Sequence, residues 1–253
     1  MTRFSPPIIH QCSACAGYFK RYALISLFFD SVTEWSDGKN GQWWANASGS
    51  VARCPACAGI VWLADASEVM RAPYKPLPIG PLARVWYQLT GDRGGRLRDE
   101  REWDSLPAGI RDAEQLAGLK CADDFIEALA ALPPDLDDRE KHLRQRLWWA
   151  SNDHLRVLDS EAGVALQPAV AEEIARANAE RLVKLLEHDA NGQVARGELL
   201  RQMGRFDEAV AVLKAVIPDG YSEVKAIKIE RFALARENRL QMMDRDQAKA
   251  RVW

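Results

Sequence analysis

The sequence predicts an α+β protein in which a small four-cysteine β module precedes a mostly helical domain. Three observations lead to this prediction. Four of the five cysteines form two matching pairs within the first 66 residues, where apolar stretches are short and end at turn residues. Four of the twelve prolines lie in residues 72–81. After a glycine-rich break at 91–95, apolar residues recur about every 3.6 positions, the period of a helix.

Composition and charge narrow the class of protein. The chain has 253 residues, 47% of them hydrophobic, which is enough apolar surface for a stable core. Its net charge of −2 gives no general attraction to nucleic acid or to an anionic membrane, so any such binding must be local. No apolar run approaches the ~20 residues of a membrane-spanning helix, and no signal-peptide stretch opens the sequence. We therefore expect a cytoplasmic protein without a membrane partner.

The first module is expected to be built from short strands. Residues 22–29 are rich in aromatic and branched side chains and favour a strand, although a helix over 22–32 fits the same apolar run. Ser36-Asp37-Gly38 predicts a hairpin turn with residues 42–47 as the returning strand. Residues 60–63 form a further expected strand.

These patterns divide the chain into three expected parts. Residues 1–66 form the metal-binding module, residues 67–95 a connector rich in proline and glycine, and residues 96–253 the helical domain. Prolines exclude a helix interior or a central strand from 72–81. Capping signals and apolar spacing predict helices in the last part from 123 to the prolines at 133 and 134, and over 137–158, 168–188 and 222–243.

The two cysteine pairs carry the same pattern, C-x-A-C-A-G. Two cysteines three positions apart let one tight turn place both sulfur atoms about 2.3 Å from one ion, and two such turns complete a tetrahedron. The pattern therefore predicts one Zn²⁺ ion per chain, bound by Cys12, Cys15, Cys54 and Cys57. Iron is the alternative ion, because it takes the same ligands. Four cysteines leave no position for water, so we expect a structural site and no catalytic one.

Residues 8–64 resemble the zinc-ribbon and rubredoxin-like group, in which paired cysteine knuckles sit at the ends of β-hairpins. The resemblance rests on the four cysteines. The family knuckle commonly has glycine directly after its second cysteine, whereas Ala16 and Ala58 stand there and glycine follows one residue later. The long stretch between the two pairs implies an elaborated hairpin.

Two further clusters bear on nucleic-acid binding. Trp35, Trp43 and Trp44 flank a turn whose one cation is Lys39, whereas stacking on single strands needs exposed rings among several basic residues. We expect at least two of these indoles to cover the small core or its interface with the helical half. The arginines that follow the connector alternate with acidic residues and predict a solvated mixed-charge face: Arg93, Arg96, Arg98 and Arg101.

Residues 193–218 resemble one unit of a tetratricopeptide repeat. In that family, small residues let two antiparallel helices approach, and Gly204 stands where the first helix of the pair would end. The packing positions of the motif are occupied by Gly197, Leu200, Ala209 and Leu213. Only one unit is recognisable, so a plain helical bundle with one αα-hairpin is the equal alternative.

The sequence offers no set of residues for catalysis. Its four histidines are scattered, its acidic pairs stand at expected helix starts, and Cys121 stands alone without a recognisable base. We therefore expect a non-catalytic zinc-binding adaptor whose helical surface binds another protein. A nucleic-acid-associated zinc-ribbon protein is the first alternative, and an enzyme with an unrecognised site is the second.

Overall fold

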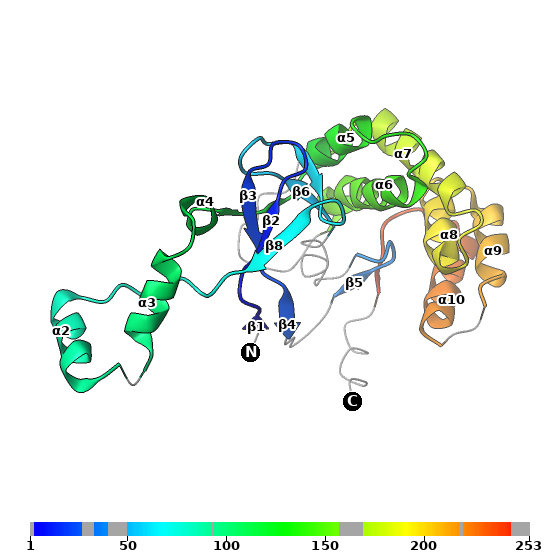
Figure 1. Cartoon of the computed structure of the whole chain (residues 1–253). Coiled ribbons are helices and arrows are strands. Elements are labelled where there is room, and N and C mark those ends of the chain that lie inside the picture. Colours follow the sequence, from blue (N-terminus) through cyan, green and yellow to red (C-terminus); the bar gives the residue numbers. More distant parts are fainter. Residues whose placement is uncertain are drawn as a thin grey trace. The chain divides into compact units, whose positions relative to one another are not determined.

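The computed structural model describes residues 3–26, 33–39, 50–92, 94–156, 169–217 and 220–243. These residues form both strands and helices, as an α+β fold requires (Figure 1). Contacts group the chain into two compact units, the first comprising 1–29 and 44–119 and the second 30–43 and 120–253. We call them the cysteine unit and the helical unit.

The described residues of the cysteine unit form three small groups of paired strands. The largest sheet has the order β8 (Ser67–Arg71), β2 (Ile8–Gln11), β3 (Tyr18–Arg21) and β9 (Glu114–Gln115). The second consists of β10 (Ala117–Gly118), β6 (Val51–Arg53) and β7 (Ile60–Trp62), and the third pairs β1 (Arg3–Phe4) with β4 (Leu24–Ser26). Of the strand predicted over 22–29, the described part forms a strand at 24–26, where the helical alternative is not adopted, and the strand predicted over 60–63 is present at 60–62.

The connector contains a helix that its proline-rich sequence did not predict. Residues 72–80 have no regular structure, as predicted, but Pro81 opens α2 (Pro81–Thr90) because proline suits the first turn of a helix. Positive φ angles at Gly91 (79°) and Gly95 (70°) produce the predicted break. The helices α3 (Arg96–Asp104) and α4 (Ala108–Arg111) complete this stretch.

The helical unit is a succession of helices that pack on their neighbours along the chain (Figure 1). They are α5 (Ala122–Ala130), α6 (Asp137–Asn152), α7 (Glu172–Leu185), α8 (Gln193–Gln202), α9 (Phe206–Lys214) and α10 (Tyr221–Leu234), with short 3-10 turns η1 (Asp153–Leu155) and η2 (Ala190–Gly192). The helix predicted over 222–243 ends early, at Leu234, and Arg236 has a left-handed φ of 55°. The expected helix start at Pro168 lies outside the described residues.

The units divide the chain differently from the predicted boundaries. Residues 33–39, which we expected in the metal-binding module, pack in the helical unit, where β5 (Glu34–Trp35) pairs with β11 (Met242–Met243). The stretch 96–119, which we expected to begin the helical domain, belongs to the cysteine unit because β9 and β10 extend its sheets. Both differences arise from strand pairing between residues far apart in sequence. The returning strand expected at 42–47 lies outside the described residues.

The helices α8 and α9 pack against each other. Leu200 is 1% exposed and Ala209 is fully buried, and both belong to one core cluster with residues of α6, α7 and α10. Gly204 ends the first helix with a φ of 76°, and the N–H of Arg205 donates to the carbonyl of Leu200 at 2.9 Å.

Gly197→Ala will lower the free energy of unfolding by about 1–3 kcal/mol, because a methyl group at this position would lie 2.5 Å from Cγ of Leu213. Leu213→Ala alone will cost about 2–5 kcal/mol, since this side chain is buried. The double variant should be more stable than the sum of the two losses implies, because truncating Leu213 makes room for the new methyl group. Urea unfolding followed by circular dichroism measures all three values, and simple additivity would contradict the contact.

Candidate metal centre

Each cysteine knuckle forms the turn of a β-hairpin. Cys12 directly follows β2, and its N–H donates to the carbonyl of Gly17 at 2.9 Å before β3 begins. Cys54 directly follows β6, and its N–H donates to Gly59 at the same distance before β7 begins. The two repeats of the sequence pattern thus have the same local structure.

The two turns bring the four thiols together. Their sulfur atoms all lie within 4.8 Å of one another, and those of Cys15 and Cys54 are 3.8 Å apart. Four thiolates placed about 2.3 Å from one tetrahedral ion would be separated by roughly 3.8 Å, so the observed spacing suits a single metal ion. Cys12 and Cys54 are buried, whereas Cys15 and Cys57 are exposed. The described residues therefore hold a four-cysteine cluster at metal-binding distance.

The alanine that departs from the zinc-ribbon pattern adopts the conformation that glycine would have favoured. Ala16 and Ala58 both have a φ of 57°, in the left-handed region. The N–H of each donates to the carbonyl of the first cysteine in its knuckle, at 2.9 Å from Ala16 and 2.8 Å from Ala58. The left-handed conformation costs a residue with a side chain about 1–2 kcal/mol. The fold of each knuckle therefore overrides the backbone preference of alanine.

The knuckles touch at Gly17. A methyl group there would lie 2.9 Å from Cβ of Ala56 in the other knuckle, whereas a methyl group at Gly59 would meet only Sγ of Cys57, at 3.3 Å. Gly17 therefore lets the two turns approach closely enough to share an ion.

Gly17→Ala will weaken metal binding more than Gly59→Ala does. Neither glycine has a left-handed φ, so the two variants differ mainly in the contact with Ala56. Overpacking of this kind costs about 1–3 kcal/mol, which corresponds to roughly a tenfold to hundredfold loss of affinity. Competition with a chromophoric zinc chelator measures the two affinities, and equal losses in both variants would contradict the role of the close approach.

The thiols differ in how readily they lose a proton. Burial opposes ionisation of Cys12, but the backbone N–H groups of its own knuckle and the neighbouring sulfur atoms hold the pKa of its thiol below the ordinary value. Burial raises the pKa of the Cys54 thiol. The N–H of Gly17 stabilises the Cys15 thiolate, yet the surrounding sulfur atoms, first that of Cys57, raise the pKa of Cys15 to about 12. A cation is therefore needed to hold four thiolates together, and its uptake releases protons.

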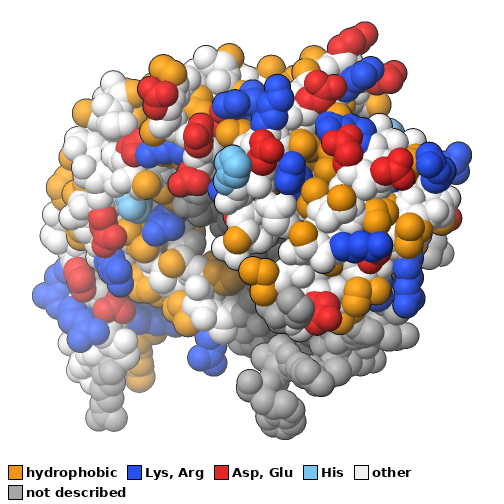
Figure 2. Space-filling model, turned by 90° about the vertical axis from the view of Figure 1, so that its right-hand side faces the viewer, with side chains coloured by type: hydrophobic (Ala, Val, Ile, Leu, Met, Phe, Trp, Pro, Cys, Tyr) orange, Lys and Arg blue, Asp and Glu red, His pale blue; other side chains and the backbone are white. Residues whose placement is uncertain are grey.

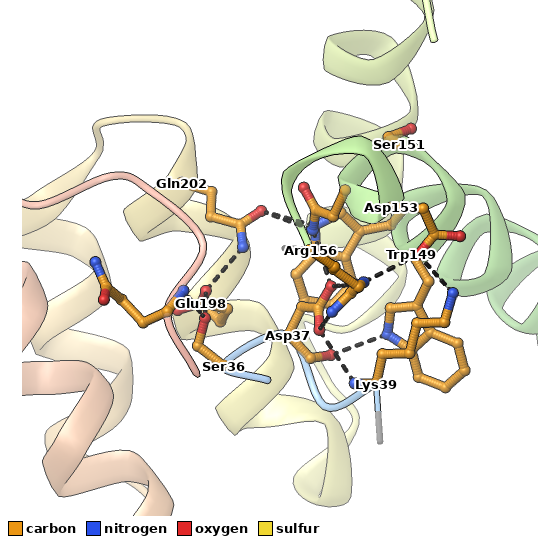
Figure 3. Close-up of polar contacts among 12 residues, drawn as sticks. Ser36, Asp37, Lys39, Trp149, Ser151, Asp153, Arg156, Glu198 and Gln202 are labelled. Carbon is orange, nitrogen blue, oxygen red and sulfur yellow. Dashed lines mark hydrogen bonds and ion pairs between the residues drawn. The ribbon is translucent and has the colours of Figure 1, made fainter. Parts of the chain in front are cut away.

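The turn between the two knuckles lies in the helical unit, where a buried network of polar contacts surrounds it (Figure 3). The carboxylate of Asp37 accepts bonds from both terminal nitrogens of Arg156 and, at 2.9 Å, from Nδ2 of Asn152. Its backbone carbonyl accepts from Nε1 of Trp149 at 3.0 Å. The side chain of Asp37 is 0% exposed, so its charge is compensated by Arg156, by Asn152 and by the N–H of Lys39, which donates to Oδ1 at 3.1 Å.

Ser36 extends the network to α8. Its hydroxyl donates to Oε1 of Glu198 at 2.6 Å and accepts from the N–H of Gln241 at 3.1 Å. Glu198 forms two hydrogen bonds of 2.7 Å with Arg201, and both side chains of this ion pair are 0% exposed. Gln202 donates to the same carboxylate at 2.8 Å. A Glu and an Arg three positions apart in a helix look like a surface pair in the sequence, so sequence reasoning missed them.

The residues considered for nucleic-acid binding do not form one surface among the described residues. Trp35 and Lys39 are buried in the helical unit, where Nζ of Lys39 lies 2.5 Å from Oδ1 of Asp153 and burial lowers the pKa of this lysine. Neither side chain presents the exposed surface that base stacking requires. Arg98 pairs with Asp99 at 3.2 Å in the mixed-charge face predicted for α3. Trp43, Trp44 and Arg93 lie outside the described residues.

The remaining candidates stand apart from the thiol cluster. Cys121 precedes α5, where its N–H donates to Oδ2 of Asp124 at 3.2 Å. His10 lies in β2 and stacks on Phe19, with 5.6 Å between ring centroids, whereas the other histidines belong to the helical unit: His142, His154 and His188. No helix among the described residues is long and apolar enough to cross a membrane.

Comparison with known proteins found no match, so the candidate metal site is argued from its own residues. The chain matches no protein-family model, no curated protein and no solved structure.

Proposed function

We propose that the protein is a non-catalytic zinc-binding adaptor, in which a structural zinc ion folds the cysteine unit and the helical unit binds a partner protein. The observation that carries the proposal is the convergence of four sulfur atoms within 4.8 Å from two knuckles. Four thiolates occupy every position of a tetrahedral ion and leave none for a substrate or an activated water. Zinc suits a site whose task is structural, because it has no redox chemistry.

Polar side chains of α6 and α8 are already bonded to the turn at 36–38. Asn152 on α6 donates to Asp37, and Glu198 on α8 accepts from Ser36. A partner would therefore bind elsewhere on this unit, and α10 offers a suitable face. Its exposed apolar residues lie opposite its buried ones and are Tyr221 (68% exposed), Val224 (45%), Ile227 (42%) and Leu234 (64%).

Apolar residues gathered on one helix face support a protein partner better than a nucleic acid. On the side of the molecule shown in Figure 2, basic and acidic side chains are interspersed and apolar side chains lie between them. Such a surface has no field of a single sign to attract a polyanion.

Two measurements test the proposal. Elemental analysis of the purified chain, prepared with a reductant and sufficient metal, should find about one zinc per chain. For the partner, a photo-crosslinking residue placed on α10 of the full chain should capture a defined protein in cells, and Ile227→Glu should abolish the capture. Ile174→Glu is the matched control, because Ile174 has the same residue type and the same 42% exposure on α7.

Point variants are required here, because deleting residues 1–66 would remove the turn that covers the buried charges of Glu198 and Arg201. Absence of stoichiometric zinc would refute the metal assignment. Capture that persists in Ile227→Glu would refute the binding face.

A further inference from the structure

The four thiols of the candidate metal centre differ in their access to solvent. Each knuckle has one cysteine inside and one outside: Cys12 and Cys54 are 2% and 1% exposed, whereas Cys15 and Cys57 lie on the surface. The buried pair belongs to a core cluster of the cysteine unit. An oxidant in water therefore reaches the outer sulfur of each knuckle without any unfolding of the chain.

The exposed sulfur of one knuckle lies beside the buried sulfur of the other. Sγ of Cys15 and Sγ of Cys54 are 3.8 Å apart, whereas a disulfide bond is about 2.05 Å long. A movement of about 1.8 Å would join the two atoms. The contact between the knuckles at Gly17 keeps this pair together. Cys54 is thus in position to attack Cys15 once the sulfur of Cys15 has been oxidised.

A bond between these two cysteines would dismantle the metal site. Only two thiolates would remain for an ion that takes four ligands, and the free energy of zinc binding is also free energy of folding. The sulfur of Cys54 would have to leave its place in the core cluster, where Phe19 and Val61 are buried beside it. The helical unit contains none of the four cysteines and has a core of its own.

We propose that the four-cysteine cluster is a peroxide-sensitive switch, in which a disulfide between Cys15 and Cys54 releases zinc and unfolds the cysteine unit while the helical unit stays folded. This inference rests on the proposed zinc site and deepens it, because it names the condition under which the structural ion is lost. Zinc has no redox chemistry, so the electrons come from sulfur.

The oxidation has two steps. The thiolate of Cys15 attacks one oxygen of hydrogen peroxide, the O–O bond breaks, and hydroxide takes up a proton and leaves as water. The thiolate of Cys54 then attacks the sulfenic acid of Cys15, so that the S–S bond forms, the S–O bond breaks, and a second hydroxide leaves as water after taking up a proton. Two thiolates lose two electrons in total, and one peroxide is reduced to two waters. The disulfide ties the two hairpins together, so a dithiol reductant regenerates both cysteines close to each other.

The test starts from the full, reduced chain after its zinc content has been measured. Hydrogen peroxide should release about one zinc per chain, which a chromophoric chelator detects. Mass spectrometry after alkylation of the remaining thiols should locate the disulfide at Cys15 and Cys54. Hydrogen exchange should show lost protection in β2, β3, β6 and β7 but not in α6 to α9. A dithiol reductant with added zinc should restore the protection.

Replacing one exposed cysteine at a time distinguishes the two knuckles. Cys15→His and Cys57→His each keep a set of three cysteines and one histidine, which zinc also accepts. Cys15→His has no thiol to form the proposed bond and should release zinc on the order of tenfold more slowly. Cys57→His is the matched control, because it keeps Cys15 and Cys54 and should respond to peroxide as the unaltered chain does.

Cys121 is the internal reference for oxidation, because it is a half-buried thiol outside the cluster. Absence of zinc from the reduced chain would refute the zinc site itself. Zinc that stays bound at peroxide concentrations that oxidise Cys121 would overturn the switch alone, and so would a disulfide that leaves out Cys15 or Cys54. Equal rates of zinc release from the two histidine variants would also overturn it. The mapping uses the unaltered chain and decides the proposal even where a histidine variant fails to fold.

Discussion

Arg201→Ala will lower the free energy of unfolding of the helical unit by about 3–5 kcal/mol. The side chain of Arg201 is completely buried, forms two hydrogen bonds of 2.7 Å with Glu198, and donates to the backbone carbonyls of Glu237 and Arg239. Its removal leaves the carboxylate of Glu198 buried with only neutral partners. Burying an uncompensated charge is among the largest costs that one substitution can impose. Urea unfolding followed by circular dichroism at 222 nm measures the loss.

The pair formed by Arg205 and Glu208 provides the matched control. Like the pair on α8, it joins an Arg and a Glu three positions apart, with 2.7 Å between Nε and Oε1. Its two side chains, however, are 42% and 58% exposed. Arg205→Ala should cost roughly 0–1 kcal/mol, because water replaces the lost partner. Similar losses in the two variants would show that the pair on α8 is not sequestered from water.

Cys54→Ser/Cys57→Ser will remove the metal and unfold the cysteine unit. Structural zinc sites supply about 10–16 kcal/mol of apparent binding free energy, and Cys12 and Cys54 are themselves buried in one of the core clusters of this unit. Hydrogen exchange should show lost protection in β2, β3, β6 and β7, together with loss of zinc by elemental analysis. The helices α6 to α9 should remain protected, because their core is made of their own apolar side chains.

The turn between the knuckles further tests whether the cysteine unit unfolds separately from the helical unit. Residues 35–39 lie between the two cysteine pairs in sequence, yet they should stay protected in the double cysteine variant, because Asp37 and Ser36 are bonded to α6 and α8. Cys121→Ser is the control for loss of a thiol outside the cluster and should retain zinc. Concerted loss of protection in α6 to α9 would show that the two units fold as one.

Much of the candidate metal site could be predicted from the sequence, because its chemistry is local. Two cysteines three positions apart specify a turn that directs two sulfur atoms to one point, whatever surrounds them. The structure brings Cys12, Cys15, Cys54 and Cys57 within 4.8 Å, as that pattern requires. The turn at Gly204 was equally predictable, since a left-handed residue at the end of a helix favours glycine.

Other features were set by contacts between distant residues. The short strands β9 and β10 have two residues each, too few for an apolar period, and exist because β3 and β6 provide edges to pair with. The sequence alone did not predict α2, because three prolines before it and Pro81 at its first position suggested an extended connector. The ion pair between Arg84 and Glu100 joins α2 to α3, and no local pattern in either helix predicts it.

The turn at Ser36-Asp37-Gly38 shows most clearly which features depend on local sequence and which depend on tertiary packing. Local preferences determined that a turn forms there, because Asp and Gly suit its backbone angles. Only the tertiary structure decided where the turn packs, since Asp37 meets Arg156 and Ser36 meets Glu198 across more than a hundred residues. A buried charge is stable only beside a correctly placed partner, and that placement depends on how the helices pack.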